Sequence, residues 1–166
     1  MTMDPRSIDP RAFGVVEAAI DDDAAQTLAE DCARAMWKGD AASQALGMRI
    51  DEVGPGRAVL VMKVRPDMLN GHQTCHGGFI FALADSAFAF ACNSYDRATV
   101  AAGCSIEYLA PARAGELLRA EAVERSRSGR TGVYDIPVSG EDGRSVALFR
   151  GKSHEIKGPV IGPAAG

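Results

Sequence analysis

The residues with the most evident chemistry lie in a short segment near the middle of the chain. The segment reads NGHQTCHGG from Asn70 to Gly78 and precedes an apolar run that contains one acid, Asp85. The HGG triplet is expected to begin a helix, and a helix N-terminus presents unpaired N–H groups and a positive dipole end. Glycine also lets a ligand approach the backbone closely. Such donors suit the oxyanion that forms when a carbonyl carbon is attacked, so Gly77 is a candidate oxyanion donor.

Asp85 is a candidate catalytic carboxylate. From Gly78 onward the helical run is apolar on all sides, which predicts that it is enclosed rather than lying on a surface. An unpaired carboxylate is costly in such surroundings, and the local sequence offers no Arg or Lys as its partner. A structural carboxylate at a loop end is the alternative interpretation. Because a desolvated carboxylate is a stronger base than a solvated one, catalysis is favoured.

The spacing of these two residues predicts a homodimer. Gly77 and Asp85 are eight residues apart, which separates them by roughly 12 Å along one helix. They cannot both contact one carbonyl carbon, so two helices must pack antiparallel about a two-fold axis if both act. The alanines of this run allow such close packing; they are Ala82, Ala84, Ala87 and Ala89.

The elements around this helix predict an α+β fold. The central helix is expected over residues 76–93 and an N-terminal helix over residues 21–39. Alternating apolar residues and intervening turns predict six strands: 46–50, 58–64, 98–109, 116–125, 132–138 and 145–149, the last extending toward His154. Pro137 is awkward inside its strand, since it has no N–H for the ladder. An antiparallel sheet wrapped around one long helix is the hotdog architecture.

Composition limits the classes of partner. The chain has 166 residues and a formal net charge of −4, which favours one domain and argues against nucleic acid or anionic membrane as a partner. Its four cysteines form no CxxC pair, and no export signal or membrane-spanning apolar run is visible, so a cytoplasmic protein with reduced thiols is expected.

The sequence resembles the hydroxyphenylacetyl-CoA thioesterases of phenylacetic acid degradation, a family of the hotdog superfamily. The match runs from about Asp31 to Lys157 and rests on NGHQTCHGGFIFALADSAFAFACNS and TGVYDIPVSGEDGRSVALFRGKSH. The predicted organisation is therefore an N-terminal extension over residues 1–30, partly disordered or helical, a hotdog domain over 31–157 and a flexible tail over 158–166.

The resemblance also implies the roles of individual residues. The Gly77 N–H polarises a thioester carbonyl, Asn70 and His76 frame the site, and Asp85 of the partner subunit acts as nucleophile or general base. Ser86 provides a hydroxyl that could orient this carboxylate. The family implies tetramers built from dimers and an aryl-acetyl thioester of coenzyme A as substrate, with no separate cofactor.

The phosphates of coenzyme A require basic or polar groups near the mouth of the pocket. Five residues are candidates, although each is also explained as an ordinary solvated group on a hairpin: Arg113, Ser128, Arg130, Thr131 and Arg150.

Other interpretations remain. A hotdog hydratase or dehydratase also needs a carboxylate and a histidine, and a non-catalytic acyl-CoA sensor would need a reader module that the sequence does not show. His72 and His76 have metal-ligand spacing, but no third ligand stands nearby, so no metal is expected. Cys75 adjoins His76 but is interpreted as structural, because adjacent side chains rarely face each other. The HGG triplet also occurs in lipase-type hydrolases, but no GxSxG accompanies it.

Overall fold

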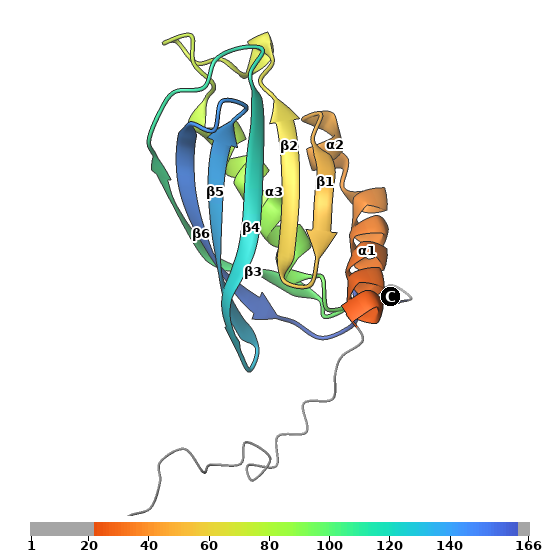
Figure 1. The fold of residues 1–166 in the computed structure, drawn as a ribbon. Helices are drawn as coiled ribbons and strands as arrows, with labels where there is room; N and C mark the ends of the chain where they lie inside the picture. Colours follow the sequence, from red (N-terminus) through yellow and green to blue (C-terminus); the bar gives the residue numbers. More distant parts are fainter. Residues whose placement is uncertain (1–21, 163–166) are drawn as a thin grey trace, which may run out of the picture.

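The computed structural model describes residues 22–162, which form one antiparallel sheet packed on a central helix (Figure 1). The predicted behaviour of residues 1–21 and 163–166 lies outside this described part. The elements in chain order are α1 (Asp22–Gly39), α2 (Ala41–Ala45), β1 (Arg49–Gly54), β2 (Arg57–Lys63), a 3-10 turn (Pro66–Met68), α3 (Gly77–Cys92), β3 (Thr99–Tyr108), β4 (Leu117–Ser128), β5 (Thr131–Gly140) and β6 (Ser145–Glu155).

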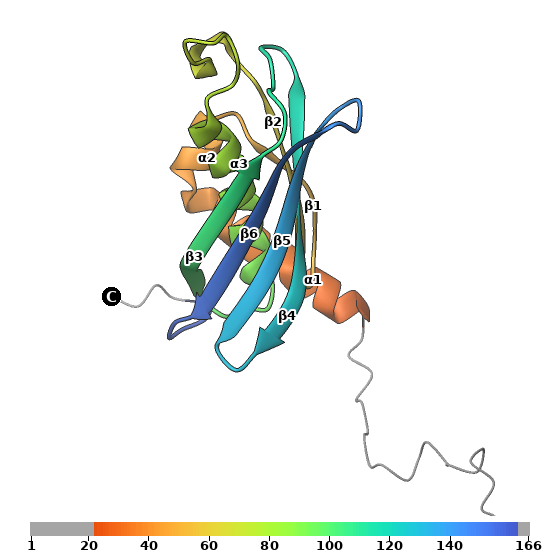
Figure 2. The ribbon, with the colours of Figure 1, turned by 90° about the vertical axis from the view of Figure 1, so that its left-hand side faces the viewer.

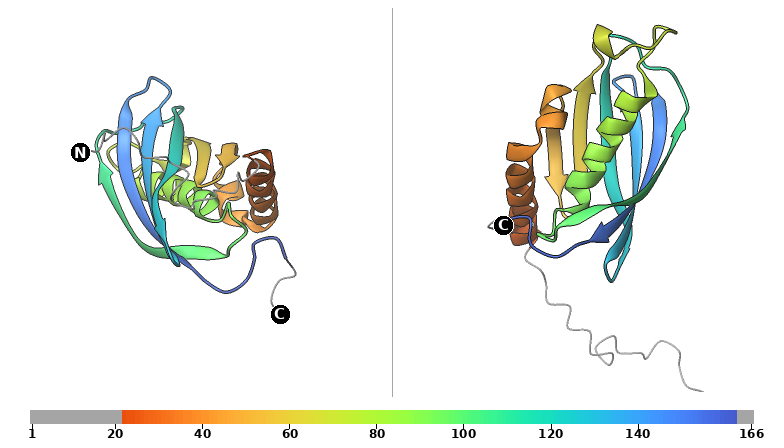
Figure 3. Two further views of the ribbon diagram at one scale, coloured as in Figure 1. Left: turned by 60° about the horizontal axis from the view of Figure 1, so that its bottom comes forward. Right: turned by 180° about the vertical axis from the view of Figure 1, so that it is seen from behind.

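The sheet has six strands in the order β1-β2-β4-β5-β6-β3, with every neighbouring pair antiparallel. It curves around α3, which lies across its concave face (Figures 2 and 3). This arrangement confirms the α+β hotdog prediction. The core lies between the sheet and α3, where Phe88 of the helix contacts Tyr134 of β5 and Phe149 of β6.

Helix α3 is buried on the side that faces the sheet and partly accessible on the other. Ile80, Leu83, Ala84, Ala87 and Phe88 are among its buried residues, whereas Ala82, Asp85, Ser86 and Ala89 are half-buried. A helix with apolar residues on all sides needs cover on all sides. Within residues 22–162, the sheet covers one side of α3 and helices α1 and α2 contact part of the other, which leaves Ala82, Asp85 and Ala89 half-buried.

Helix α1 lies along the outer edge of β1 (Figure 1). The side-chain amide of Gln26 donates a hydrogen bond of 2.7 Å to the carbonyl oxygen of Val53 in β1. Because an edge strand otherwise exposes unpaired backbone groups, α1 covers this side of the sheet.

The predicted strand over residues 46–50 is partly wrong. Leu46 caps the end of the short helix α2, and the strand begins only at Arg49. The helix forms because the Asp40 carboxylate accepts a hydrogen bond of 3.0 Å from the N–H of Ser43, which satisfies an N-terminal donor. Leu46 therefore packs against the core from a helix end rather than from a strand.

Pro137 lies inside β5, and the ladder accommodates it. The pairing with β4 joins Asp135 to Val123 and Val138 to Ala120, with no pair at Pro137 itself. A missing N–H explains this gap, because proline cannot donate to the neighbouring strand.

Strand β3 contains a bulge that decides which of its residues face α3. Ala101 pairs with Ser153 and Gly103 pairs with the next residue, Lys152, so Ala102 is an extra residue in β3. A bulge of this kind reverses the alternation of the side chains that follow it.

Candidate active site

The start of α3 is fixed by a loop that folds back on its own backbone. The N–H of His76 bonds the carbonyl oxygen of Met68 at 2.8 Å, and the N–H of Cys75 bonds that of Ala112 at 2.8 Å. His76 then caps the helix, since its Nδ1 accepts a hydrogen bond of 3.0 Å from the N–H of Gly78. Because Nδ1 is an acceptor, a neutral His76 ring carries its proton on Nε2 and can donate it outward.

Asn70 organises the same loop. Its side-chain oxygen accepts hydrogen bonds from the N–H of His72 at 2.9 Å and from the N–H and hydroxyl of Thr74 at 3.3 and 3.2 Å. These contacts account for a role of Asn70 as a turn former. Its amide nitrogen has no partner among residues 22–162 and remains able to donate to a ligand.

Gly77 is the first residue of α3, so helix geometry leaves its N–H without an intrahelical acceptor. The ring of Tyr108 at the end of β3 lies against it, and the Tyr108 hydroxyl donates a hydrogen bond of 2.9 Å to the Gly77 carbonyl oxygen. A Cβ at position 77 would come within 2.9 Å of Tyr108 Cζ, so a side chain here would displace the Tyr108 ring. Asn70, Gly77 and Tyr108 line one open cleft, together with Ile80 and Leu109.

Asp85 lies on the half-buried side of α3, two turns beyond Gly77. Burial raises the pKa of its carboxyl group, and a hydrogen bond from the Cys104 thiol of β3, at 3.9 Å from Oδ1, partly offsets this effect. No Arg, Lys or His within residues 22–162 forms an ion pair with it. A desolvated carboxylate without a cation is a competent base or nucleophile.

Ser86 follows Asp85, but its hydroxyl is engaged elsewhere. Ser86 Oγ lies 2.9 Å from Oγ of Ser43, a buried residue of α2. This bond ties α2 to α3 beside the carboxylate.

One chain therefore brings Asn70, His76 and Gly77 together but leaves Asp85 apart from them. Asp85 does not line the cleft of Asn70 and Gly77. Eight residues of helix separate the two positions by roughly 12 Å along the axis of α3.

The candidate groups for coenzyme A are spread over three places. Arg113 adjoins Ala112, whose carbonyl binds the Cys75 N–H, so it lies beside the loop of the cleft. The turn with Ser128, Arg130 and Thr131 joins β4 to β5 at the opposite end of the sheet (Figure 1).

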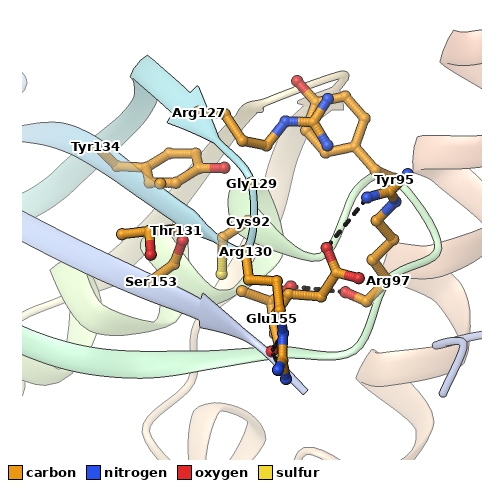
Figure 4. Close-up of a pocket in the computed structure, with 12 residues that line it drawn as sticks. Cys92, Tyr95, Arg97, Arg127, Gly129, Arg130, Thr131, Tyr134, Ser153 and Glu155 are labelled. Carbon is orange, nitrogen blue, oxygen red and sulfur yellow. Dashed lines mark hydrogen bonds and ion pairs between the residues drawn. The ribbon is translucent and has the colours of Figure 1, made fainter. Parts of the chain in front are cut away.

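This turn borders a small pocket that contains three arginines (Figure 4). The Arg127 guanidinium stacks 3.9 Å above the Tyr95 ring, Arg97 bonds the Glu155 carboxylate, and Arg130 donates to the Glu155 carbonyl. Figure 4 shows Thr131 facing Ser153 on the other side of this pocket.

Arg150 lies on the face of the sheet turned away from α3. Its neighbour Phe149 packs against the helix, so alternation directs Arg150 outward. There it makes two hydrogen bonds, of 2.6 and 3.0 Å, to Asp135.

The residues 22–162 contain no cluster of three or more His, Cys, Asp or Glu side chains arranged to hold a metal ion. Cys75 is buried, and burial raises the pKa of its thiol to about 11. A thiol that holds its proton so firmly is a poor nucleophile. In the same part of the chain, no helix has the length and apolar character needed to cross a membrane.

Three residues of the site were not predicted: Tyr108, Cys104 and Ser43. The first two lie beyond the bulge of β3, and their inward orientation depends on the extra residue there. Ser43 belongs to the short helix that alternation concealed, although Asp40 three residues before it is a recognisable capping signal.

The chain matches known thioesterases over most of its length. A family model described as the Thioesterase superfamily covers residues 72–147. The acyl-coenzyme A thioesterase PaaI of Escherichia coli (strain K12) is 51% identical over 132 residues, which span 80% of this chain and 94% of that protein.

Solved structures agree with this match. The E. coli PaaI protein from the phenylacetic acid degradation operon superposes with a TM-score of 0.80 at 49% identity, over 81% of this chain and 97% of that one. A mutant of the phenylacetic acid degradation protein PaaI from Thermus thermophilus gives a TM-score of 0.66 at 44% identity, over 69% and 97% of the two chains.

The fold and these matches define a hotdog thioesterase, an enzyme that hydrolyses thioester bonds. Within that superfamily, the chain belongs to the PaaI-type acyl-CoA thioesterases of phenylacetate degradation. Because the chain belongs to this family of thioester hydrolases, the hydratase and acyl-CoA sensor interpretations are wrong.

Proposed function

We propose that this thioesterase hydrolyses phenylacetyl-CoA and hydroxyphenylacetyl-CoA to the free acid and coenzyme A, at a site built from two subunits. The observation that carries the proposal is the division of the catalytic groups within one chain. The Gly77 N–H and Asn70 line one cleft, while the Asp85 carboxylate lies elsewhere on the same helix. A second copy, related by a two-fold axis, supplies the missing half of each site.

Two surfaces of the single chain support a dimer. Strand β3 is an edge of the sheet, and most of its residues are exposed. The side of α3 that carries Ala82, Asp85 and Ala89 is only half-buried. Pairing of β3 with its copy, with the two α3 helices antiparallel, covers both surfaces and brings each Asp85 toward the partner's cleft. A tetramer of two such dimers is the assembly that the resemblance implies.

The proposed reaction begins with the thioester carbonyl oxygen bound to the Gly77 N–H. Asn70 and the Nε2–H of His76 border the acyl group and the sulfur. Asp85 of the other subunit then acts in one of two ways. It attacks the carbonyl carbon, expels the CoA thiolate and leaves a mixed anhydride that water hydrolyses. Alternatively, it removes a proton from a water that attacks the carbonyl carbon, the C–S bond breaks, and the departing CoA thiolate takes up that proton.

The two routes differ in the fate of solvent oxygen. Under single-turnover conditions in oxygen-18 water, the anhydride route introduces label into Asp85 when water attacks the carboxyl carbon of Asp85. The general-base route places label in the released acid only. Label found by mass spectrometry in the peptide that contains Asp85 therefore supports the anhydride route.

Replacing Asp85 with Asn tests the assignment of the carboxylate. The variant keeps the shape of the side chain and removes the base, so kcat should fall by at least roughly a hundredfold. Circular dichroism and thermal unfolding should remain those of a folded protein. Near-normal turnover by a folded Asp85→Asn enzyme would refute the assignment.

Mixing two inactive variants tests the shared site. One carries Asp85→Asn, and the other carries Gly77→Pro, which removes the N–H. Unfolding and refolding them together in equal amounts yields mixed dimers, in which one site has both changes and the other has none. Activity should recover to about one quarter of the wild-type value, because half of the dimers are mixed and each has one intact site. No recovery from a sample that contains mixed dimers would exclude a site shared between chains.

Coenzyme A phosphates are proposed to bind Arg113 and the turn with Ser128, Arg130 and Thr131. Arg113 lies beside the cleft of its own chain, and an antiparallel dimer brings the turn of the partner toward the same cleft. Arg150 has less support, since Asp135 already binds its guanidinium on the outer face. Arg113→Gln or Arg130→Gln should raise KM and leave kcat unchanged. Arg150→Gln serves as the comparison.

A cytoplasmic location is proposed together with this function. All four cysteines are free thiols, as expected in a reducing compartment. The thioester substrate belongs to the same compartment, where coenzyme A is used.

A further inference from the structure

Strand β3 contacts both catalytic halves of its own chain. Cys104 reaches the Asp85 carboxylate, and Tyr108 reaches the Gly77 carbonyl, four residues further along the same strand. The proposed function uses neither residue.

The bulge at Ala102 is what directs these side chains toward α3. Ala101 lies opposite the buried Ser153, so simple alternation would turn Gly103, Ser105 and Glu107 toward the helix. The extra residue shifts the alternation by one position.

After the bulge, Cys104 lies opposite Gly151, and Tyr108 lies opposite Ala147. Directly opposed residues project from the same face of a sheet. Gly151 faces the helix, because a Cβ there would come within 2.8 Å of the Phe88 ring. Cys104 and Tyr108 therefore point at α3 only because β3 is bulged.

We infer that strand β3 positions both catalytic groups of its own chain: the Cys104 thiol orients the Asp85 carboxylate, and the Tyr108 hydroxyl orients the Gly77 turn. This inference rests on the proposed function, since it concerns the residues that the proposal makes catalytic. Cys104 and Tyr108 are positioning residues, because each acts through the group that it binds.

Among the described side chains near Asp85, Cys104 is the one that donates a hydrogen bond to its carboxylate. Burial and the neighbouring Asp85 raise the pKa of the Cys104 thiol, so it keeps its proton and remains a donor. The other titratable neighbour is Cys92 on α3 itself, whose pKa burial raises to about 12. No ion pair from the strands or from α1 and α2 reaches Asp85 within residues 22–162.

Substitutions on β3 test the inference. Cys104→Val removes the donor at similar volume, and Cys104→Ser keeps a hydroxyl donor. Tyr108→Phe removes the hydroxyl and keeps the ring over Gly77. Ser105→Ala is the matched control, since Ser105 is on the same strand, follows Cys104 and points to the opposite face.

The expected results separate positioning from a merely structural role. Cys104→Val should lower kcat/KM roughly threefold and move the acid limb of its pH profile to higher pH, because the carboxylate loses a donor. Cys104→Ser should restore part of both effects. Tyr108→Phe should lower kcat roughly three- to tenfold with little change in KM. Ser105→Ala should behave as the wild type, and light scattering should show one assembly state for all four variants.

Double variants decide whether each residue acts through its partner. Cys104→Val should cause no further loss in an Asp85→Asn enzyme, and Tyr108→Phe should cause none in a Gly77→Pro enzyme. Additive losses, or an unmoved acid limb in Cys104→Val, would overturn the inference. If Asp85→Asn itself retains full turnover, the proposed function fails instead.

Discussion

The sharpest test of the oxyanion site replaces Gly77 with proline and compares it with alanine. Both changes add a Cβ at position 77, but only proline removes the backbone N–H. The surrounding backbone accepts proline: position 77 is the first residue of α3, where proline is common, and His76 before it has φ −61° and ψ 133°, an extended conformation that a following proline requires.

The size of the effect follows from the contacts of position 77. The added Cβ comes within 2.9 Å of Tyr108 Cζ, at the far end of a side chain that is 52% exposed and can shift. Gly77→Ala should therefore lose less than roughly tenfold in kcat. Losing one donor of an oxyanion site costs roughly a hundred- to a thousandfold in kcat, so Gly77→Pro should be slower than Gly77→Ala by that further factor.

The assay follows the release of free coenzyme A from phenylacetyl-CoA with a chromogenic thiol reagent, corrected for the thiols of the enzyme. Thermal unfolding of both variants checks that each remains folded. Equal rates for the folded alanine and proline variants would show that the Gly77 N–H does not bind the oxyanion, and the mechanism would need another donor.

Three further predictions concern stability. Burial raises the pKa of Asp85 in the folded protein, so ionisation of this carboxyl opposes folding once the pH exceeds its unfolded pKa of about 4. Asp85→Asn should therefore be more stable than wild type in urea near pH 7, and this gain should vanish below about pH 4, where the carboxyl is protonated in both states. Ser43→Ala should lower the free energy of unfolding by about 1 kcal/mol, and adding Ser86→Ala should cost no more, since the two hydroxyls bond each other. Gly151→Ala should cost about 1–3 kcal/mol in the same urea titrations, because its Cβ comes within 2.8 Å of the buried Phe88 ring; an unchanged midpoint would contradict that contact.

Much of the fold could be predicted because its signals are local. The apolar run after HGG indicated the central helix to within a residue at each end, and Gly-Pro-Gly and Ser-Gly turns divided the strands. Helix α2 was missed because Leu46, Met48 and Ile50 alternate as a strand would. The Asp40 cap overrides this alternation through a hydrogen bond that the apolar pattern does not contain.

The candidate site likewise contains residues that the sequence indicates and residues that it does not. Asn70, His76, Gly77 and Asp85 were recognisable because they differ in type from their neighbours and lie at informative spacing. Tyr108 and Cys104 were not, since their orientation depends on a bulge that arises from pairing between β3 and β6, strands about fifty residues apart in sequence. Long-range register of this kind is not encoded in any single segment.

The two edge strands of the sheet differ in how they are covered, and this difference limits polymerisation by strand pairing. At the β1 edge, α1 lies against the strand and Gln26 binds the Val53 carbonyl, so the helix obstructs pairing with a second strand there. At the β3 edge, no further strand from residues 22–162 pairs with the backbone. If the β3 edges pair as proposed, strand-to-strand growth adds one copy and then stops, because the resulting dimer has α1 at both outer edges of its sheet. A sheet with two open edges would instead permit fibres.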